Sequence, residues 1–160
     1  MLRSRSRPRR VACRTPFDED ARALALELAE LSPPQTISGM TVGLVFEPGE
    51  VAWRAVSLQL RHRLAGSWSQ PSECRALVTS RRVLVQLPTT ASLSLWWGSL
   101  VGFQPRIAEG YVVLDYGDGS PRMLSGPYVG VVAVAGVACL YGVTALAEHP
   151  ALEPLRGDVR

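Results

Sequence analysis

The chain contains no lysine, and arginine supplies all 17 of its basic residues. Arginine codons are rich in G and C and lysine codons in A and T, so this bias indicates a GC-rich genome rather than a functional choice. Several of these arginines precede the first acidic residue, Asp18: Arg3, Arg5, Arg7, Arg9, Arg10 and Arg14. The net charge of +3 therefore comes from this amino-terminal arm, and the remainder of the chain is slightly acidic.

Cysteine is scarce as well. Cys13, Cys74 and Cys139 are widely spaced and form no C-x-x-C pair, so they predict no disulfide framework and fit a reducing compartment. The short apolar stretch at residues 11–13 is interrupted by Arg14, which argues against a secretory signal peptide. We therefore expect a cytoplasmic protein, with the membrane surface as the alternative location.

Residues that carry chemistry are few. Only two histidines occur, His62 and His149, and the sequence has no G-x-S-x-G motif, phosphate loop or paired zinc-ligand spacing. Asp115 and Asp118 resemble part of a calcium loop, but the remaining ligand positions are missing, so we interpret them as turn residues. The sequence predicts no enzyme, no metal site and no cofactor.

Changes in composition divide the chain into three parts. Residues 1–39 combine an arginine-rich arm, predicted to be disordered, with an amphipathic helix from Thr15 to about Leu31 and a linker. Residues 40–149 form the predicted ordered domain, and residues 150–160 form a tail. Thr15 and Pro16 are typical of a helix start, since they supply a hydroxyl cap and a proline at the first position.

The ordered part reads as short strands separated by turns. An irregular alternation in residues 51–63 predicts a β-bulge near Ala55, and residues 64–72 read as a polar loop. Glycine and aspartate at residues 117–119 predict a tight hairpin. The expected strands are residues 41–46, 51–63, 75–80, 82–87, 93–97, 100–103, 111–116 and 122–124.

One long uncharged segment, residues 127–147, follows the strands and is predicted to be one continuous helix. On one face we expect Val132, Leu140 and Val143 to be buried. The opposite face is also apolar, and we predict that protein covers it, either the amino-terminal helix or a second copy of the chain. Its candidate partner-contact residues are Val131, Val134, Ala138, Tyr141 and Ala145.

Two segments resemble the bacterial branch of the pleckstrin-homology superfamily, close to GRAM-type domains. They are Leu-Val-Thr-Ser-Arg-Arg-Val-Leu-Val at residues 77–85 and Leu-Trp-Trp-Gly-Ser-Leu-Val at residues 95–101; residues 111–118 and the closing helix complete the pattern. The resemblance covers residues 74–147 and extends to about two thirds of the chain if residues 40–63 supply the first strands. It implies an α+β fold, a small antiparallel β-barrel or roll capped by a carboxy-terminal helix. The chain departs from the family pattern in one respect: both faces of its closing helix are apolar.

The same resemblance implies an anion-binding place along the strand that contains Arg54, Arg61, His62 and Arg63. In pleckstrin-homology domains this place often binds phosphoinositide headgroups, and guanidinium groups suit phosphate oxygens. The alternative is a solvated strand edge whose charges discourage aggregation. Trp68, in the following loop, is a further candidate contact for a partner.

Two function classes remain open. The first is a non-catalytic interaction or scaffolding domain that binds protein partners, including a second copy of itself. The second is a membrane-associated protein, held by the apolar segment 127–147 or by the arginine arm on anionic lipid. Nucleic acid is an expected partner only through the arm of Arg3 to Arg14.

Overall fold

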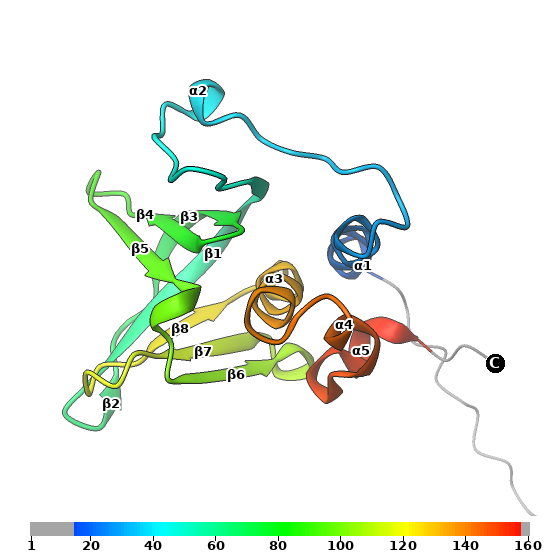
Figure 1. Ribbon diagram of the computed structural model, residues 1–160. Helices are drawn as coiled ribbons and strands as arrows, with labels where there is room; N and C mark the ends of the chain where they lie inside the picture. Colours follow the sequence, from blue (N-terminus) through cyan, green and yellow to red (C-terminus); the bar gives the residue numbers. More distant parts are fainter. Residues whose placement is uncertain (1–14, 158–160) are drawn as a thin grey trace, which may run out of the picture.

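The computed structural model describes residues 15–157, and its centre is an 8-stranded antiparallel sheet. The strand order is β5-β4-β3-β1-β8-β7-β6, and β2 pairs with β1 off this path. Figure 1 shows the sheet bent around α3, with α1 and α5 on the other side of that helix. The strands are β1 Ala52–Leu64, β2 Ser67–Trp68, β3 Ser72–Thr79, β4 Arg82–Gln86, β5 Ser92–Trp96, β6 Gly102–Arg106, β7 Tyr111–Asp115 and β8 Arg122–Ser125.

The helices lie before and after the strands in the chain. They are α1 Pro16–Leu28, α2 Gly39–Val42, α3 Val129–Tyr141, α4 Ala145–Glu148 and α5 Glu153–Arg156, with 3-10 turns at Trp97–Ser99, Ile107–Glu109 and Pro150–Leu152. An open, bent antiparallel sheet capped by a carboxy-terminal helix, with a helix at the amino-terminal side, confirms the predicted fold class. The division of the chain at residues 39 and 149 stays a prediction.

Helix α1 begins where the sequence predicts. The Thr15 hydroxyl accepts a hydrogen bond from the Asp18 N–H at 3.2 Å, and Pro16 occupies the first helical position. The helix ends at Leu28, three residues earlier than expected, because Glu30 adopts a positive φ of 60°. Ala21 and Leu24 are fully buried and join the main core.

The predicted bulge in β1 is present, but it lies at Trp53 rather than near Ala55. Ala52 pairs with Thr79 and Arg54 pairs with Val78, so Trp53 is the extra residue. The insertion turns Ala52 toward the outer face of the sheet and Arg54 toward the inner face, the face that α3 covers. From Arg54 onward, alternate residues of β1 are buried up to Leu60.

The prediction of a strand at residues 41–46 is wrong. Residues 39–42 form the short helix α2, which ends at Gly43 with a φ of 70°. The apolar side chains of Ile37, Leu44 and Phe46 instead pack on the outer face of the sheet, against a small cluster made by Ala52, Leu77 and Leu84. The loop expected at residues 64–72 is also corrected, since β2 pairs Trp68 with Arg63 in a hairpin.

Helix α3 is the centre of the core, and every residue from 129 to 137 is buried. The prediction of one helix over residues 127–147 is wrong, because Gly142 has a φ of 92° and ends α3 before the short helix α4. The Val132 prediction is confirmed. Leu140 is only partly buried, and Val143, which lies beyond the end of α3, is 46% exposed.

No helix among residues 15–157 has both the length and the apolar character needed to cross a membrane. The apolar segment that raised this alternative forms a 13-residue helix in the core.

Replacing Gly136 by alanine is expected to destabilise the protein, although alanine is the better helix former by about 1 kcal/mol. A Cβ atom at Gly136 would fall on the Phe103 ring of β6. We expect G136A to lose roughly 1–3 kcal/mol of unfolding free energy, the usual cost of overpacking. Chemical denaturation followed by tryptophan fluorescence measures it. Gly98→Ala is the control, because a Cβ there meets open space; equal midpoints for the two variants would contradict this packing.

Candidate interaction site

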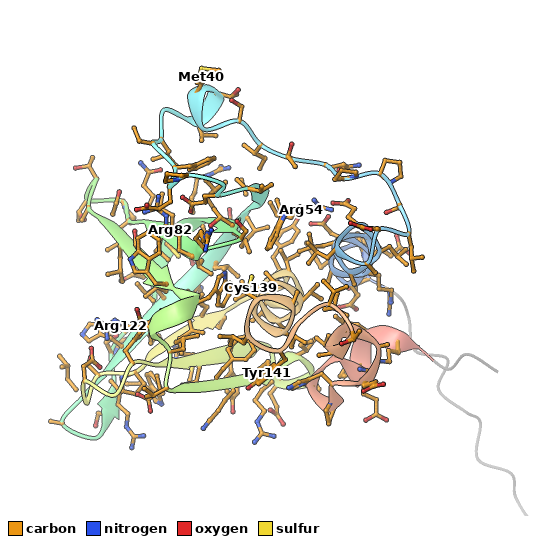
Figure 2. All side chains as sticks on the ribbon, in the orientation of Figure 1. Met40, Arg54, Arg82, Arg122, Cys139 and Tyr141 are labelled. Atoms are coloured by element: carbon orange, nitrogen blue, oxygen red, sulfur yellow. The ribbon has the colours of Figure 1, made fainter. Side chains whose placement is uncertain are left out.

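Arg54 joins α1 to the sheet through a buried ion-pair network. Its Nε donates to Asp20 Oδ1 at 2.9 Å, and its Nη2 and Nη1 donate to the Glu27 carboxylate at 2.6 and 3.1 Å. Arg54 is 8% exposed, and Figure 2 shows it between the sheet and α1. With its guanidinium held by two acids of the same chain, Arg54 does not join Arg61 and Arg63 in an anion site.

The Glu27 carboxylate is ionised despite its burial. Desolvation would raise its pKa, but the hydrogen bonds from Arg54 and from the Gln35 N–H outweigh it, so that the pKa lies below its ordinary value of 4.5. A buried pair of this kind stabilises the docking of α1 only while both partners are charged and hydrogen-bonded.

Arg61, His62 and Arg63 lie at the far end of β1, where it pairs with β8 and β2. Arg63 is exposed, and its guanidinium lies 5.9 Å from the centre of the Trp68 ring, a cation–π geometry. Arg61 and Arg63 share the outer face of the sheet, whereas His62 follows the inner-face alternation of Leu60. The structure thus brings together Arg61, Arg63 and Trp68, and separates them from Arg54.

The apolar stripe predicted on the closing helix divides into two parts. Val131 and Val134 are fully buried, Ala138 and Ala145 are partly buried, and Tyr141 is 55% exposed. Cover comes from the same chain: Gly130 lies against Ala21 of α1 and Leu155 of α5. Tyr141, which Figure 2 labels, stacks on His149 with ring centroids 5.2 Å apart.

A second buried network fixes the segment before β1 to the turn between β3 and β4. The Thr79 hydroxyl donates to Glu50 Oε1 at 2.7 Å, and Arg82 Nε donates to the same oxygen at 2.9 Å. Burial would raise the pKa of Glu50, but hydrogen bonds from Thr79, the Glu47 N–H and Arg82 lower it. Arg82 also lies 4.6 Å from the centre of the Trp96 ring and donates to Ser94 Oγ, so this network reaches β5.

Two backbone hydrogen bonds, one at each end of the β4–β5 pair, show which groups of β5 face β4. The Leu87 N–H donates to the Ala91 carbonyl, and the Trp97 N–H donates to the Arg81 carbonyl. Backbone groups of successive residues in an antiparallel strand point alternately to opposite sides, so Leu93 and Leu95 also face β4. The N–H and C=O groups of Ser92, Ser94 and Trp96 therefore point away from β4, toward the free edge of the sheet.

This edge is unprotected. Among residues 15–157, β4 is the one strand that pairs with β5. Natural proteins blunt such edges with charges, prolines or bulges, and β5 contains none of these in the sequence Ser-Leu-Ser-Leu-Trp. The opposite edge, β6, is protected, since Pro105 lacks an N–H group and Arg106 is charged and exposed. We therefore take the free edge of β5, residues 92–96, as the candidate interaction site.

Sequence reasoning identified the strand at residues 93–97 but not its role. The absence of charge in residues 92–96 was the available signal; the missing information was the strand order, which places β5 at an edge. The arginine arm, the other predicted contact, lies outside the described residues.

An apolar groove of about 750 Å³ lies between the end of α1, the linker and the start of β1. Leu28, Leu31, Pro33, Pro34, Val51 and Trp53 contribute to its lining. No pattern of charged groups selects a ligand there, because Glu27, its most buried acid, is already bound to Arg54.

The described residues hold little reactive chemistry. Burial raises the pKa of both described thiols, that of Cys139 to about 11, so both are protonated at neutral pH and are poor nucleophiles. Within residues 15–157, no three side chains of His, Cys, Asp or Glu gather in a way that could hold a metal ion.

Acid is expected to weaken the fold through Glu27 and Glu50. Both have a folded-state pKa below the ordinary 4.5, so their stabilisation is present above the unfolded pKa and is lost as pH falls through the folded pKa. Glu27→Gln should therefore lose less stability than the parent between pH 7 and pH 3, measured as the shift in denaturation midpoint. Glu19→Gln, an exposed position of α1, is the control and should keep the parental acid sensitivity. Identical acid sensitivity in all three proteins would contradict the role of Glu27.

No protein-family model matches the chain, and no curated protein matches its sequence. Among solved structures, the chain is similar to the N-terminal PH domain of Vps36, with 17% identity, 64% of this chain and 86% of that domain covered, and a TM-score of 0.41. It is also similar to the C-terminal domain of an unknown protein from Leishmania infantum, with 9% identity, 58% and 85% covered, and a TM-score of 0.40. Because both TM-scores lie below 0.5, we base the functional proposal on this chain's own residues.

Proposed function

We propose that the chain is a non-catalytic protein-interaction module that accepts an extended segment of a partner as an additional strand beside β5. The free edge of β5 supports this: three residues direct backbone donors and acceptors outward, unpaired by any residue from 15 to 157, from a strand that lacks charge, proline and bulge. Backbone groups of another protein chain are the natural partners of such an edge. A cytoplasmic location is part of the proposal.

We further propose that the domain is of the bacterial, GRAM-type kind of pleckstrin-homology-like domain; the arrangement of the sheet supports the pleckstrin-homology-like layout. One antiparallel meander contains β1, β3, β4 and β5, and a second contains β6, β7 and β8. Strand β1 bridges them, since it pairs with β3 along Ala52–Leu60 and with β8 only near its far end. The closing helix α3 follows the last strand directly, which is the order that the sequence resemblance implies.

The side chains of β5 define what a partner strand should look like. Leu93 and Leu95 point to the inner face, and Ser94 and Trp96 point to the outer face beside Leu84 and Arg82. Leu93 is only partly buried, so an apolar residue placed next to it would gain contact area. We therefore expect an extended segment with alternating apolar residues and no charge in contact with Leu93.

A second candidate function, binding to an anionic surface, has a specific observation in its favour. Arg61 and Arg63 share the outer sheet face with Trp68, and Arg63 is exposed with its guanidinium 5.9 Å from the centre of the Trp68 ring. Guanidinium groups suit the oxygens of phosphate headgroups. The arginine arm of Arg3 to Arg14, which the sequence also predicts to contact anionic lipid, is a further candidate contact for this second function.

Vesicle binding tests that second candidate. If Arg61 and Arg63 contact anionic headgroups, the parent protein should sediment with phosphatidylserine vesicles at low salt, and R61E/R63E should sediment less. The arm is intact in every variant and can bind on its own, so Arg81→Glu/Arg106→Glu, which removes two exposed arginines elsewhere, is the charge-matched control and should sediment like the parent. Equal sedimentation of the two double variants would eliminate this face.

Ser94→Pro tests the proposed function. Proline removes an N–H that points away from β4, so no backbone hydrogen bond of the sheet is lost and the variant should stay folded. The probes are extended peptides selected on the parent from a displayed random library. Their affinity, measured by fluorescence anisotropy, should fall at least about tenfold for S94P, as expected for lost backbone bonds.

Ser94→Ala is the matched control, because it keeps the N–H and removes only the hydroxyl. It should bind these peptides within about threefold of the parent. Selected peptides that bind S94P and the parent equally well, or a library that yields no binder, would reject strand addition at β5.

A further inference from the structure

We infer that β5 of a second copy of this chain occupies the free edge, so that two copies pair antiparallel about a twofold axis at Ser94. This inference rests on the proposed function, because it names the partner of the same edge.

The backbone of β5 is complementary to itself in one register. If Ser94 pairs with Ser94 of the second copy, then Ser92 pairs with Trp96 of that copy, and Trp96 with its Ser92. These are the residues whose N–H and C=O groups point to the free edge, so each pair can exchange two hydrogen bonds. Leu93 and Leu95 then face one another at the intervening, non-hydrogen-bonded positions.

Other registers fit less well. Shifting the pairing by two residues in one direction places Thr90 opposite Trp96, but Thr90 has a φ of 66° and lies outside the strand. Shifting it in the other direction places Gly98, within the 3-10 turn Trp97–Ser99, opposite Ser92. Only the register centred on Ser94 uses the whole of Ser92–Trp96, which favours a twofold dimer over sliding assemblies.

The inner face of the joined sheet would be apolar across the contact. In one chain Val83 pairs with Leu95, and Val85 pairs with Leu93. The twofold operation extends these pairs into rows of four, in which Val83 and Leu95 are followed by Leu93 and Val85 of the second copy. The core layer thereby continues from one copy to the other, and the partly exposed Leu93 becomes covered.

The outer face brings no like charges together. Its central row would contain Leu84 and Ser94 from each copy, and the flanking rows would contain Arg82, Trp96, and then Ser92 and Gln86 of the second copy. Each Arg82 is separated from the other copy by its own Trp96, against which it packs at 4.6 Å, and it is neutralised by Glu50. Charge therefore does not oppose self-pairing, whereas a charged partner strand would find no counter-charge on β5.

A contact of one strand from each copy is smaller than a standard interface of about 800 Å² per partner, so the dimer is expected to dissociate on dilution. Sedimentation velocity of the full chain over a dilution series measures this, with an increase from monomer to dimer mass as concentration rises. S94P should remain monomeric, with association weakened at least about tenfold, and S94A should associate like the parent.

A charge swap tests the twofold axis itself. Ser94→Lys and Ser94→Glu each place like charges opposite one another and should be monomeric alone, while an equimolar mixture should form a dimer. Thermal unfolding by circular dichroism establishes that each variant is folded; an unfolded S94K is replaced by Ser94→Arg. Rescue on mixing requires that position 94 of one copy lies near position 94 of the other, as the twofold axis at Ser94 demands.

Several results would overturn the inference. These are a parent that is monomeric at all concentrations, a dimer unaffected by S94P, or a mixture of S94K and S94E that stays monomeric. A monomeric parent that still binds selected peptides in an S94P-sensitive manner would overturn self-pairing but support the proposed function. A parent protein that neither binds selected peptides nor associates would reject both.

Discussion

The structure depends on covering a helix that has no polar face. Every residue of α3 from 129 to 137 is buried, so the sheet alone, which can cover one side, is not enough. Helix α1 and the chain end around Leu155 cover the other side, and Arg54 fixes α1 there through Asp20 and Glu27. The bulge at Trp53 makes this possible because it turns Arg54 to the inner face. The apolar segment that raised the possibility of a membrane anchor is thus buried in the core over residues 129–137.

The packing of α1 on α3 also determines which groups remain accessible at the surface. Because α1 covers the second face of α3, most of the apolar stripe is unavailable to a partner, and only its end near Tyr141 remains exposed. Among residues 15–157 the sheet is open rather than closed, so that β5 and β6 are its two edges. Of these, β6 is blunted by Pro105 and β5 is not. The binding proposed for this chain therefore relies on backbone groups of β5, which carry no side-chain signature in the sequence.

The two buried ion-pair networks connect different parts of the fold. Arg54 connects α1 to the inner face, whereas Arg82 and Glu50 connect the segment before β1 to the β3–β4 turn and reach β5 through Trp96. The second network holds the outer side of the candidate edge in place without contributing a charge to the edge itself. Rigid support of this kind would lower the entropy cost of the proposed strand addition, because β5 is already ordered.

The sequence alone determined the local elements. The cap at Thr15, the hairpin with its turn at residues 80–81, and most strands follow from alternation and turn chemistry. Tertiary structure decided the different roles of residues of the same type. Gly130 and Gly136 allow close contacts of α3 with its neighbours, whereas Gly142 ends the helix. Arg54 is buried, whereas Arg63 is exposed. It also decided that β5 is an edge. The physical reason is that local propensity depends on neighbours in the chain, whereas burial, ion pairing and edge position depend on which distant strands and helices pack together.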